Sequence, residues 1–469
     1  MAGEYCQLFL NKDKPHEACG VFGIYAPGQD VARITYYGLY ALQHRGQESA
    51  GIAVSDGKRI ICRKGMGLVG EVFTEDILEK LQGQMALGHV RYTTAGDSII
   101  ENAEPLNFYY RDGMIAIGHN GSLTNSAELR RELEDAGVIF QSTADSELII
   151  SLIVRAGAKD LVSGILQTME RIEGSYSLVM LTEKRMFGIR DPYGMRPLCL
   201  GRMQAGYVLA SESCALDTVG AQFIRDIEPG EVVIIDEHGI TSLRPHKAHR
   251  KALCAFEFVY FARPDSVSDG LSVQKARYAL GRQLAKEYPL DGDMVIPVPD
   301  SGVSSALSYA AERGLPFSEG LMKNRYVGRT FIRPAQAIRE LGVRLKLNPI
   351  KEIVSGKRVI MIDDSIVRGT TSGKIVQMIR EAGAREVHLL VSSPAVTHSC
   401  YYGIDTSSRG ELIAASHCLE EIRQHIGADS LNYLSLPGLH AALAPFRPDE
   451  LCDACFCGNY PIQIPGSDK

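Results

Sequence analysis

The chain has 469 residues, more than one ordinary domain holds, so its length predicts two or three domains. Apolar residues make up 45% and charged residues 23%, as in soluble globular proteins, and no apolar run has the roughly 20 residues of a membrane span. The net charge of −6 argues against a molecule that binds nucleic acid over its whole surface. Eleven cysteines are too few for a disulfide scaffold, and residues 1–18 lack the apolar core of a secretory signal, so we expect a cytoplasmic protein with reduced thiols.

The first half of the chain carries short apolar runs that are separated by glycine. They cover residues 19–25, 49–55, 114–121, 176–182 and 231–237, and runs of this length predict strands of layered sheets. A helix is expected to begin at Asn125, capped by its side chain with Glu128 as the partner, and to end before Gly137. A second helix follows Asp145 and ends before Gly157. These patterns predict an α+β sandwich of sheets and helices.

The second half alternates strand-like and helical patterns. Strand-like runs at 294–299, 358–364 and 387–393 are interleaved with helical spacing at 273–284 and 375–382. This alternation predicts an α/β domain whose parallel sheet is covered by helices, with ligand sites at the carboxyl ends of the strands. We place the domain boundary between residues 250 and 251.

The string at 358–372, RVIMIDDSIVRGTTS, is the strongest single signal in the chain. An apolar strand ends in Asp363 and Asp364, and a loop with glycine and hydroxyl side chains then opens a helix. Backbone N–H groups at a helix start suit a phosphate, while paired acids suit sugar hydroxyls or a hard cation such as Mg²⁺. The ordinary alternative is a strand end with solvated acids followed by a helix cap.

This string resembles the phosphoribosyl diphosphate motif of type I phosphoribosyltransferases. The resemblance implies that the paired acids hold the ribose hydroxyls and that the following loop holds the 5-phosphate. It also implies that the loop 298–302 binds the diphosphate, and that Mg²⁺ lies near Ser301, Asp363 and Asp364. The implied substrate-binding residues are Asp300, Ser301, Lys323, Arg329, Asp363, Asp364, Arg368, Gly369, Thr370, Thr371 and Ser372.

Residues 323–346 form a basic segment with seven basic side chains and one acid. Such a stretch is usually a solvated face or a nucleic-acid contact, but a sugar diphosphate explains it equally well. The segment is similar to the closing loop of the same family, which excludes water from the reactive carbon.

Cys19 precedes a strand-like run, where a single cysteine is normally a core residue. Polar and glycine-rich strings at 42–48, 88–94, 118–122 and 142–147 accompany it. Together these strings resemble the N-terminal-nucleophile glutamine amidohydrolase domain over residues 19–240, an αββα sandwich. The resemblance implies a leader over residues 1–18 whose removal exposes the amine of Cys19, the nucleophile; Ala18 stands where we would look for an acid. The implied glutamine-binding residues are Arg91, Thr94, Asn120, Gly121 and Asp145, with Asn120 and Gly121 as oxyanion donors.

Both halves in this order resemble the amidophosphoribosyltransferases, from residue 19 to about residue 462. The resemblance implies glutamine-dependent amination of phosphoribosyl diphosphate, the first step of purine synthesis. It further implies feedback by purine nucleotides, a homotetramer or homodimer, and no nucleic-acid or membrane partner. No role follows for His44 or His119, which we take as structural.

Three cysteines near the end, Cys452, Cys455 and Cys457, form an ambiguous pattern by themselves. A closed cluster site needs four thiolates. One branch of the family holds a [4Fe–4S] cluster, and the resemblance implies Cys254, Cys400, Cys452 and Cys455 as its ligands. Cys457 could replace one of them, and a structural zinc would use the same sulfurs.

Two rival functions remain at this point. Another glutamine-dependent transferase, such as a glutamine–fructose-6-phosphate transaminase or an asparagine synthetase, would share the first half but would not need the string at 358–372. A non-catalytic regulator that binds nucleic acid would not need Cys19, Arg91 and Asp145 together.

Overall fold

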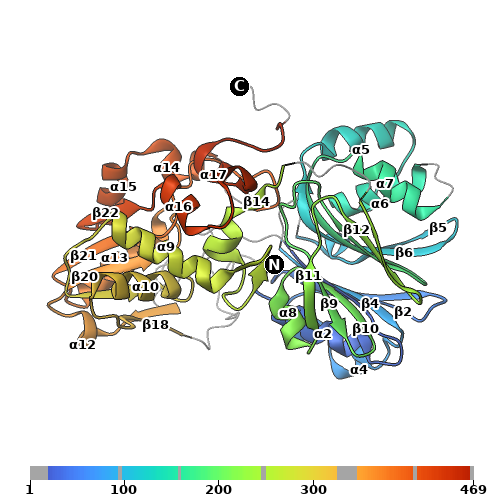
Figure 1. Cartoon of the computed structure of the whole chain (residues 1–469), viewed down its shortest axis with the longest axis horizontal. Helices are drawn as coiled ribbons and strands as arrows, with labels where there is room; N and C mark the ends of the chain where they lie inside the picture. The colour runs from blue at the N-terminus through green and yellow to red at the C-terminus, as the bar shows by residue number, and fades with distance from the viewer. Residues whose placement is uncertain are drawn as a thin grey trace.

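The computed structural model describes residues 19–92, 98–156, 160–244, 250–324, 346–404 and 409–464. The expected leader, residues 1–18, lies outside these ranges. The chain forms two bodies that lie side by side, the first coloured blue to green and the second yellow to red (Figure 1). None of the helices that the structure describes combines the length and apolar character needed to cross a membrane.

The first domain is built on two antiparallel sheets. In spatial order, the larger sheet contains β11 (Gln222–Asp226), β9 (Cys199–Met203), β10 (Gly206–Ala210), β1 (Gly20–Tyr25), β4 (Met85–Arg91), β2 (Ser49–Ser55) and β3 (Ile60–Met66). The smaller one contains β13 (Gly239–Leu243), β12 (Val232–Asp236), β8 (Met186–Arg190), β7 (Gly174–Thr182), β6 (Gly113–Leu123) and β5 (Leu106–Tyr110). Each strand-like run of the first half therefore becomes a strand.

Helices cover the outer face of each sheet. Side chains of β1, β4, β7 and β12 form a core between the sheets. A second core lies between the larger sheet and the helices α2 (Val31–Ala41), α3 (Val69–Val72), α4 (Glu75–Leu78) and α8 (Ser213–Thr218). A third lies between the smaller sheet and the helices α5 (Ser126–Asp135), α6 (Asp145–Arg155) and α7 (Leu161–Met169). The layers follow the expected αββα order.

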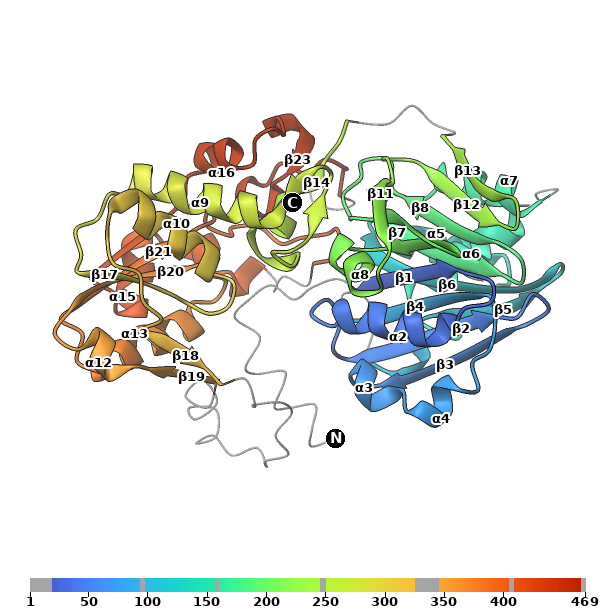
Figure 2. The ribbon, with the colours of Figure 1, turned by 60° about the horizontal axis from the view of Figure 1, so that its bottom comes forward.

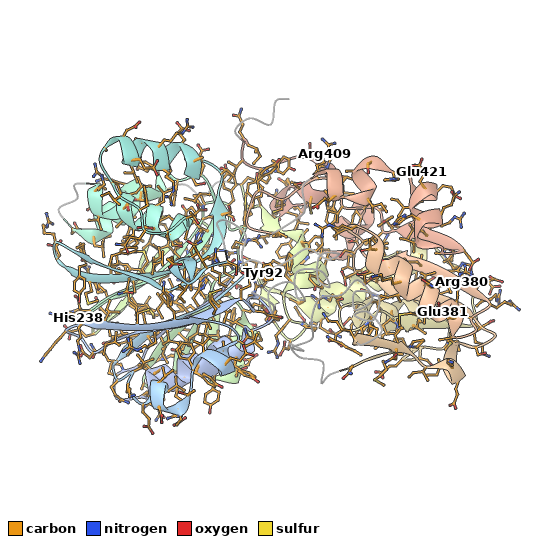
Figure 3. All side chains as sticks on the ribbon, turned by 180° about the vertical axis from the view of Figure 1, so that it is seen from behind. Tyr92, His238, Arg380, Glu381, Arg409 and Glu421 are labelled. Carbon is orange, nitrogen blue, oxygen red and sulfur yellow. The ribbon has the colours of Figure 1, made fainter. Side chains whose placement is uncertain are left out.

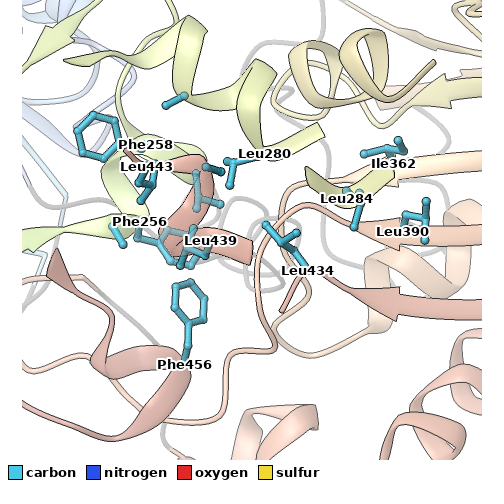
Figure 4. Close-up of a cluster of buried hydrophobic side chains, with 14 of the residues drawn as sticks. Phe256, Phe258, Leu280, Leu284, Ile362, Leu390, Leu434, Leu439, Leu443 and Phe456 are labelled. Atoms are coloured by element: carbon cyan, nitrogen blue, oxygen red, sulfur yellow. The ribbon is translucent and has the colours of Figure 1, made fainter. Parts of the chain in front are cut away.

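The second domain contains a four-stranded parallel sheet in the order β17 (Met294–Pro297), β20 (Arg358–Asp363), β21 (Glu386–Val391) and β22 (Ser430–Tyr433). Alternate residues of β20 face opposite sides: Ile360 and Ile362 pack toward α9 (Val273–Glu287), α10 (Val303–Arg313) and α16 (Leu436–Ala442). Val359 and Met361 pack toward α13 (Thr370–Glu381) and α15 (Leu419–Ile426). Figure 4 shows the first of these cores, where Leu284 of α9 lies near Ile362 and Leu390 of the sheet. Burial on both faces explains why these strands are continuously apolar.

Smaller elements complete the second domain. They are β14 (Leu253–Cys254), β23 (Leu451–Cys452), α17 (Ala454–Cys457), β15 (Val267–Ser268), β16 (Leu271–Ser272), β18 (Leu321–Lys323), β19 (Leu347–Pro349), α12 (Lys351–Val354) and α14 (Ile413–Ser416). The sandwich ends with β13 at Leu243 and β14 begins at Leu253, on either side of the predicted boundary.

The expected cap of α5 is wrong. Asn125 does occupy the N-cap position, but its side chain makes no bond to the helix. Instead its amide donates to the carbonyl of Arg171 at 2.9 Å and accepts from the N–H of Glu173 at 3.0 Å. A tertiary contact thus competes with local capping. The end of the helix is as expected, since Gly137 follows it with a φ of 83°.

A buried network of charged side chains joins the two domains. Arg45 of the first domain donates to Glu212 and, at 2.5 Å, to Glu257 of the second. Arg196 donates to the other oxygen of Glu257 at 3.2 Å, and Ser266 donates to Glu212 at 2.7 Å. Figure 2 shows β14 and β23 side by side, on the side of the second domain that faces the first. The charged side chains pair across the junction. The carboxylate of the second domain therefore neutralises buried arginines of the first, and these arginines neutralise it in turn.

We expect Glu257→Ala to destabilise this junction strongly, because it removes the carboxylate that Arg45 and Arg196 share in a buried site. Breaking one partner of a buried pair costs about 3–5 kcal/mol. Urea unfolding followed by circular dichroism measures the loss. Glu420→Ala is the control, since it removes an exposed partner of Arg423. Equal unfolding midpoints in the two variants would contradict the role of the network.

Candidate active sites

The first site gathers where β1 begins and β4 ends. β1 pairs antiparallel with β4, with Gly20 opposite Val90, so Cys19 lies beside Arg91 and Tyr92. The Cys19 thiol is 7% exposed and donates to the Tyr92 carbonyl oxygen over 3.7 Å. Figure 3 labels Tyr92 where the two domains meet. The thiol therefore lies at the edge of the sandwich that faces the second domain.

β6 brings an unusual pair of residues to the same region. Asn120 is fully buried, and neither its amide oxygen nor its amide nitrogen has a hydrogen-bond partner among the described residues. Gly121 follows with a φ of 147°, and a Cβ there would stand 2.1 Å from the carbonyl oxygen of Ser175. Asp145, the first residue of α6, accepts from the Leu123 N–H at 2.9 Å. A buried amide without a partner is costly unless a ligand satisfies it.

A buried histidine beside Cys19 was not singled out from the sequence. His89 is fully buried, and its Nε2 lies 3.0 Å from the carbonyl oxygen of His119 and 3.3 Å from Glu104. Burial lowers the pKa of His89, but Glu104 and the nearby Cys19 sulfur outweigh it and raise the pKa to about 9. In contrast, burial lowers the pKa of His119. No local pattern reveals this pair, because Glu104 and His89 meet only in the folded sandwich.

The second site lies at the carboxyl edge of the parallel sheet. β17 and β20 are neighbours, so the loop after β17 meets the end of β20. Asp363 ends β20 and, like Asp364, is almost wholly buried, and the Ser301 hydroxyl donates to Asp364. A Cβ on Gly302 would stand 2.4 Å from the Ile362 carbonyl oxygen, so only glycine allows this close approach. Two buried carboxylates beside a hydroxyl form a donor set that suits Mg²⁺.

The helix that follows offers an anion site at its start. Gly369 has a φ of 81° and precedes α13, whose first residues are Thr370 and Thr371. Arg368 forms an ion pair with Glu411 at 2.7 Å, and Lys323 of β18 forms one with Asp300. The N–H groups of the first turn and these cations surround the same edge of the sheet, which suits a phosphorylated ligand.

Four cysteines come together next to the domain junction. Cys254 of β14 lies opposite Cys452 of β23, and Cys455 and Cys400 interact electrostatically with both. Burial raises the pKa of Cys254 to about 12 although Arg196 opposes it, and burial raises the pKa values of Cys452 and Cys455 well above the usual range. All four are free thiols. Thiols whose pKa is raised in this way, as in Cys254, Cys452 and Cys455, are neutral unless a metal replaces their protons.

The fifth cysteine, Cys457, donates its thiol hydrogen to Asp453 at 3.3 Å. Within the described ranges, no three His, Cys, Asp or Glu side chains stand close enough to hold a single metal ion. A zinc ion draws its sulfurs to about 2.3 Å from one centre, whereas each thiolate of a [4Fe–4S] cluster binds a separate iron.

Comparison with known proteins agrees with this geometry. A family model described as a glutamine amidotransferase domain matches residues 89–218. The amidophosphoribosyltransferase of Synechococcus elongatus is 51% identical over 99% of this chain and 95% of its own length. That of Bacillus subtilis is 49% identical over 96% of this chain and 95% of its own. The chain belongs to the amidophosphoribosyltransferase family.

Solved structures of such enzymes share the whole fold. The glutamine phosphoribosylpyrophosphate amidotransferase from B. subtilis, complexed with ADP and GMP, matches with a TM-score of 0.91 at 48% identity, over 96% of this chain and 98% of that one. A structure described as the allosteric regulatory enzyme of purine biosynthesis matches with a TM-score of 0.92 at 49% identity, over 96% and 97% of the two chains. The family, the two-domain fold and the enzymatic function expected from the sequence are confirmed. Both rival functions are excluded.

The site residues themselves stay predictions, although most of them are brought together as expected. Thr94, Arg329 and residues 325–345 of the basic segment lie outside the described residues. His44, taken as structural, lies 2.7 Å from Glu212 in the charged junction.

The pH dependence of stability tests whether His89 is charged in the glutamine site of this amidophosphoribosyltransferase. Its pKa rises from 6.5 to about 9 on folding, so its stabilising effect is complete below pH 6.5 and is lost as the pH rises through 9. We therefore expect the difference in free energy of unfolding between wild type and His89→Gln to shrink by roughly 3 kcal/mol from pH 6 to pH 10. Urea titrations across this range measure it. His119→Gln is the control, with a difference that stays flat above pH 7; a flat difference for His89→Gln as well would show that His89 is not charged.

Proposed function

We propose that this chain couples two reactions through the domain junction. Glutamine is hydrolysed at the first site, and the ammonia that it releases passes within the protein to the second site. There it displaces diphosphate from C1 of phosphoribosyl diphosphate. Glutamine, phosphoribosyl diphosphate and water give 5-phosphoribosylamine, glutamate and diphosphate, which is the first step of purine synthesis. The observation that carries this proposal is the pairing of two sites on one chain, the Cys19 region of the first domain and the Asp363 edge of the second.

At the first site, the Cys19 sulfur attacks the amide carbon of glutamine. A tetrahedral intermediate forms, and its oxyanion accepts hydrogen bonds from the Asn120 amide and the Gly121 N–H. The unpartnered, buried amide of Asn120 supports this role, because preorganised donors in a dry site stabilise developing charge most effectively. Ammonia leaves, and water then hydrolyses the thioester to glutamate. Arg91 and Asp145 orient the α-carboxylate and α-amino groups of glutamine.

Removal of residues 1–18 gives Cys19 a free amine, which accepts the thiol proton and returns it to the leaving nitrogen. An amine beside its own thiol supplies general-base catalysis without a separate histidine. The charged His89 does not compete for this task, because an imidazolium has no lone pair to accept a proton.

At the second site, Asp363 and Asp364 hold the ribose hydroxyls, and residues 368–372 hold the 5-phosphate with backbone N–H groups and hydroxyls. The loop at Asp300 and Ser301, together with Lys323, faces the diphosphate. Mg²⁺ held near Ser301 and the paired acids would neutralise part of the diphosphate charge. Ammonia attacks C1 as the C1–O bond breaks and diphosphate departs. Exclusion of water from this carbon prevents hydrolysis.

Cys254, Cys400, Cys452 and Cys455 hold a [4Fe–4S] cluster in this proposal. The cluster would link β14, the segment after β21 and the C-terminal tail, and so contribute to stability rather than to chemistry. Support comes from four partly buried, free thiols with mutual electrostatic contact.

The regulation and assembly of the enzyme follow from its family. The B. subtilis relative was solved with ADP and GMP, which supports control of this chain by purine nucleotides. We further propose a cytoplasmic homotetramer or homodimer, without a nucleic-acid or membrane partner.

Two variants separate the two reactions. Cys19→Ala should lose glutamine-dependent activity by at least about 10³-fold while ammonia-dependent transfer persists, because only the first site needs the thiol. Asp363→Ala should lose transfer with both nitrogen sources. Product formation with glutamine or with ammonium chloride measures both, and Cys62→Ala controls for loss of a thiol elsewhere. A Cys19→Ala enzyme that still uses glutamine would refute the nucleophile, and an Asp363→Ala enzyme active with ammonia would refute the second site.

The cluster predicts a specific metal content. Anaerobically purified protein should be brown and contain about four irons per chain. Cys452→Ser should lose iron and unfold at lower temperature, whereas Cys457→Ser should keep both properties. Metal analysis and thermal melting distinguish them. Colourless, active protein with stoichiometric zinc would show that these cysteines bind zinc and not an iron–sulfur cluster.

A further inference from the structure

A turn of the second domain lies directly against the oxyanion strand of the first. This turn, residues 400–403, follows β21 and ends at Gly403, which has a φ of 87°. A Cβ on Gly403 would stand 2.8 Å from the carbonyl carbon of Gly121 and 2.9 Å from its Cα. Any side chain at this position would therefore push the Gly121 backbone, so the two glycines touch backbone to backbone.

Three hydrogen bonds hold this turn in place through a single carbonyl. The Tyr402 oxygen accepts from the Ser175 hydroxyl at 2.7 Å and from two nitrogens of Arg196 at 2.9 and 2.6 Å. Ser175 and Arg196 are almost wholly buried, and Arg196 is itself held by Glu257. Hydrogen bonds from a buried charged donor are among the strongest in proteins, so the position of the turn is well defined.

The same strands connect the turn to the oxyanion donors. Ser175 lies on β7 opposite Ser122 of β6, one residue beyond Gly121. The turn thus contacts the Asn120–Gly121 segment from two directions, through Gly403 itself and through Ser175. Gly121 also lies opposite Tyr176 in the ladder of β6 and β7, and its φ of 147° is a conformation that glycine adopts at little cost.

The segment that carries the turn also begins at the second active site. The N–H of Ser392 donates to the carbonyl oxygen of Asp363 at 2.9 Å, and the chain then runs to Cys400 and the turn. Cys400 accepts from the Tyr402 N–H at 3.3 Å, which fixes the start of the turn to a cysteine of the thiol group. One stretch of chain therefore joins the phosphoribosyl edge to the oxyanion strand.

We infer that Tyr402 and Gly403 are positioning residues for the glutamine reaction. They hold Gly121, and with it the Asn120 amide, in the geometry that receives the oxyanion, although they touch neither substrate. This inference rests on the proposed role of Asn120 and Gly121 as oxyanion donors. The alternative is that the turn only packs the domains together. Catalytic donors tolerate displacements of only about 0.5 Å, so a small shift of Gly121 should lower catalysis far more than binding.

The decisive experiment compares Gly403→Ala with Gly427→Ala. Both glycines have a positive φ, 87° and 77°, but a Cβ on Gly427 meets nothing within 4 Å, so this control carries the same backbone strain without the collision. Gly403→Ala should lower kcat for glutamine hydrolysis by about 10–100-fold, a part of the roughly 10²–10³-fold loss for removing an oxyanion donor. The KM for glutamine and ammonia-dependent transfer should stay within about threefold of wild type. Gly427→Ala should match wild type in all three.

Two further variants distinguish a wrong positioning role for the turn from a wrong oxyanion assignment. Ser175→Ala removes one bond to the Tyr402 carbonyl without a collision, and we expect a 3–10-fold loss of kcat with an unchanged KM, from about 1 kcal/mol per hydrogen bond. If Gly403→Ala does not fold, this variant decides the question. Unchanged kcat in the folded variants, or an equal loss of ammonia-dependent transfer, would overturn the positioning role. Asn120→Ala tests the proposed function itself: retained glutamine hydrolysis there would refute the oxyanion assignment, whereas its loss together with a normal Gly403→Ala enzyme would refute only the inference.

Discussion

The buried charges between the domains are the constraint on which the rest of the structure depends. Arg45 and Arg196 of the first domain meet Glu257 of the second, and Glu212 completes the set. Removing an ion from water costs several kcal/mol, so these groups are stable only when the junction brings them together. Burial alone would raise the pKa of Glu212, but Arg45 and His44 outweigh it and hold the pKa well below its usual range. The junction is therefore a defined geometry rather than a loose contact.

Both halves of the glutamine site are anchored to this network. Next to Arg45, a Cβ on Gly46 would stand 2.4 Å from the Val90 carbonyl carbon, so the segment that carries the arginine lies against the end of β4 beside Cys19. On the other side, Arg196 holds the Tyr402 carbonyl and through it the oxyanion strand. Cys19 and the proposed oxyanion donors thus share one frame with the second domain. Such a frame suits the proposed passage of ammonia between the two sites without loss to solvent.

The sequence predicted the parts of this structure that are contiguous along the chain. The string at 358–372 carries the strand, the paired acids, the loop and the helix start within fifteen residues, so its local pattern was sufficient to predict the second site. The apolar runs of the first half predicted layered sheets, and the resemblance to a known family implied the αββα order. The junction could not be predicted, because Arg45 and Glu257 are 212 positions apart and neither differs in sequence from an exposed charge. The same limit applied to His89 and to the contact of Gly403 with Gly121. The cap at Asn125 failed for a related reason, since a distant backbone segment claimed its side chain.

The passage of ammonia inside the protein is the central claim, and isotope competition tests it most directly. The enzyme would be given glutamine with a ¹⁵N amide, together with phosphoribosyl diphosphate and an excess of unlabelled ammonium, and the aminated product would be trapped and weighed by mass spectrometry. If ammonia moves within the junction, nearly all product nitrogen should carry the label whatever the ammonium concentration. A label that falls to the proportion of ¹⁵N in free ammonia would contradict the account.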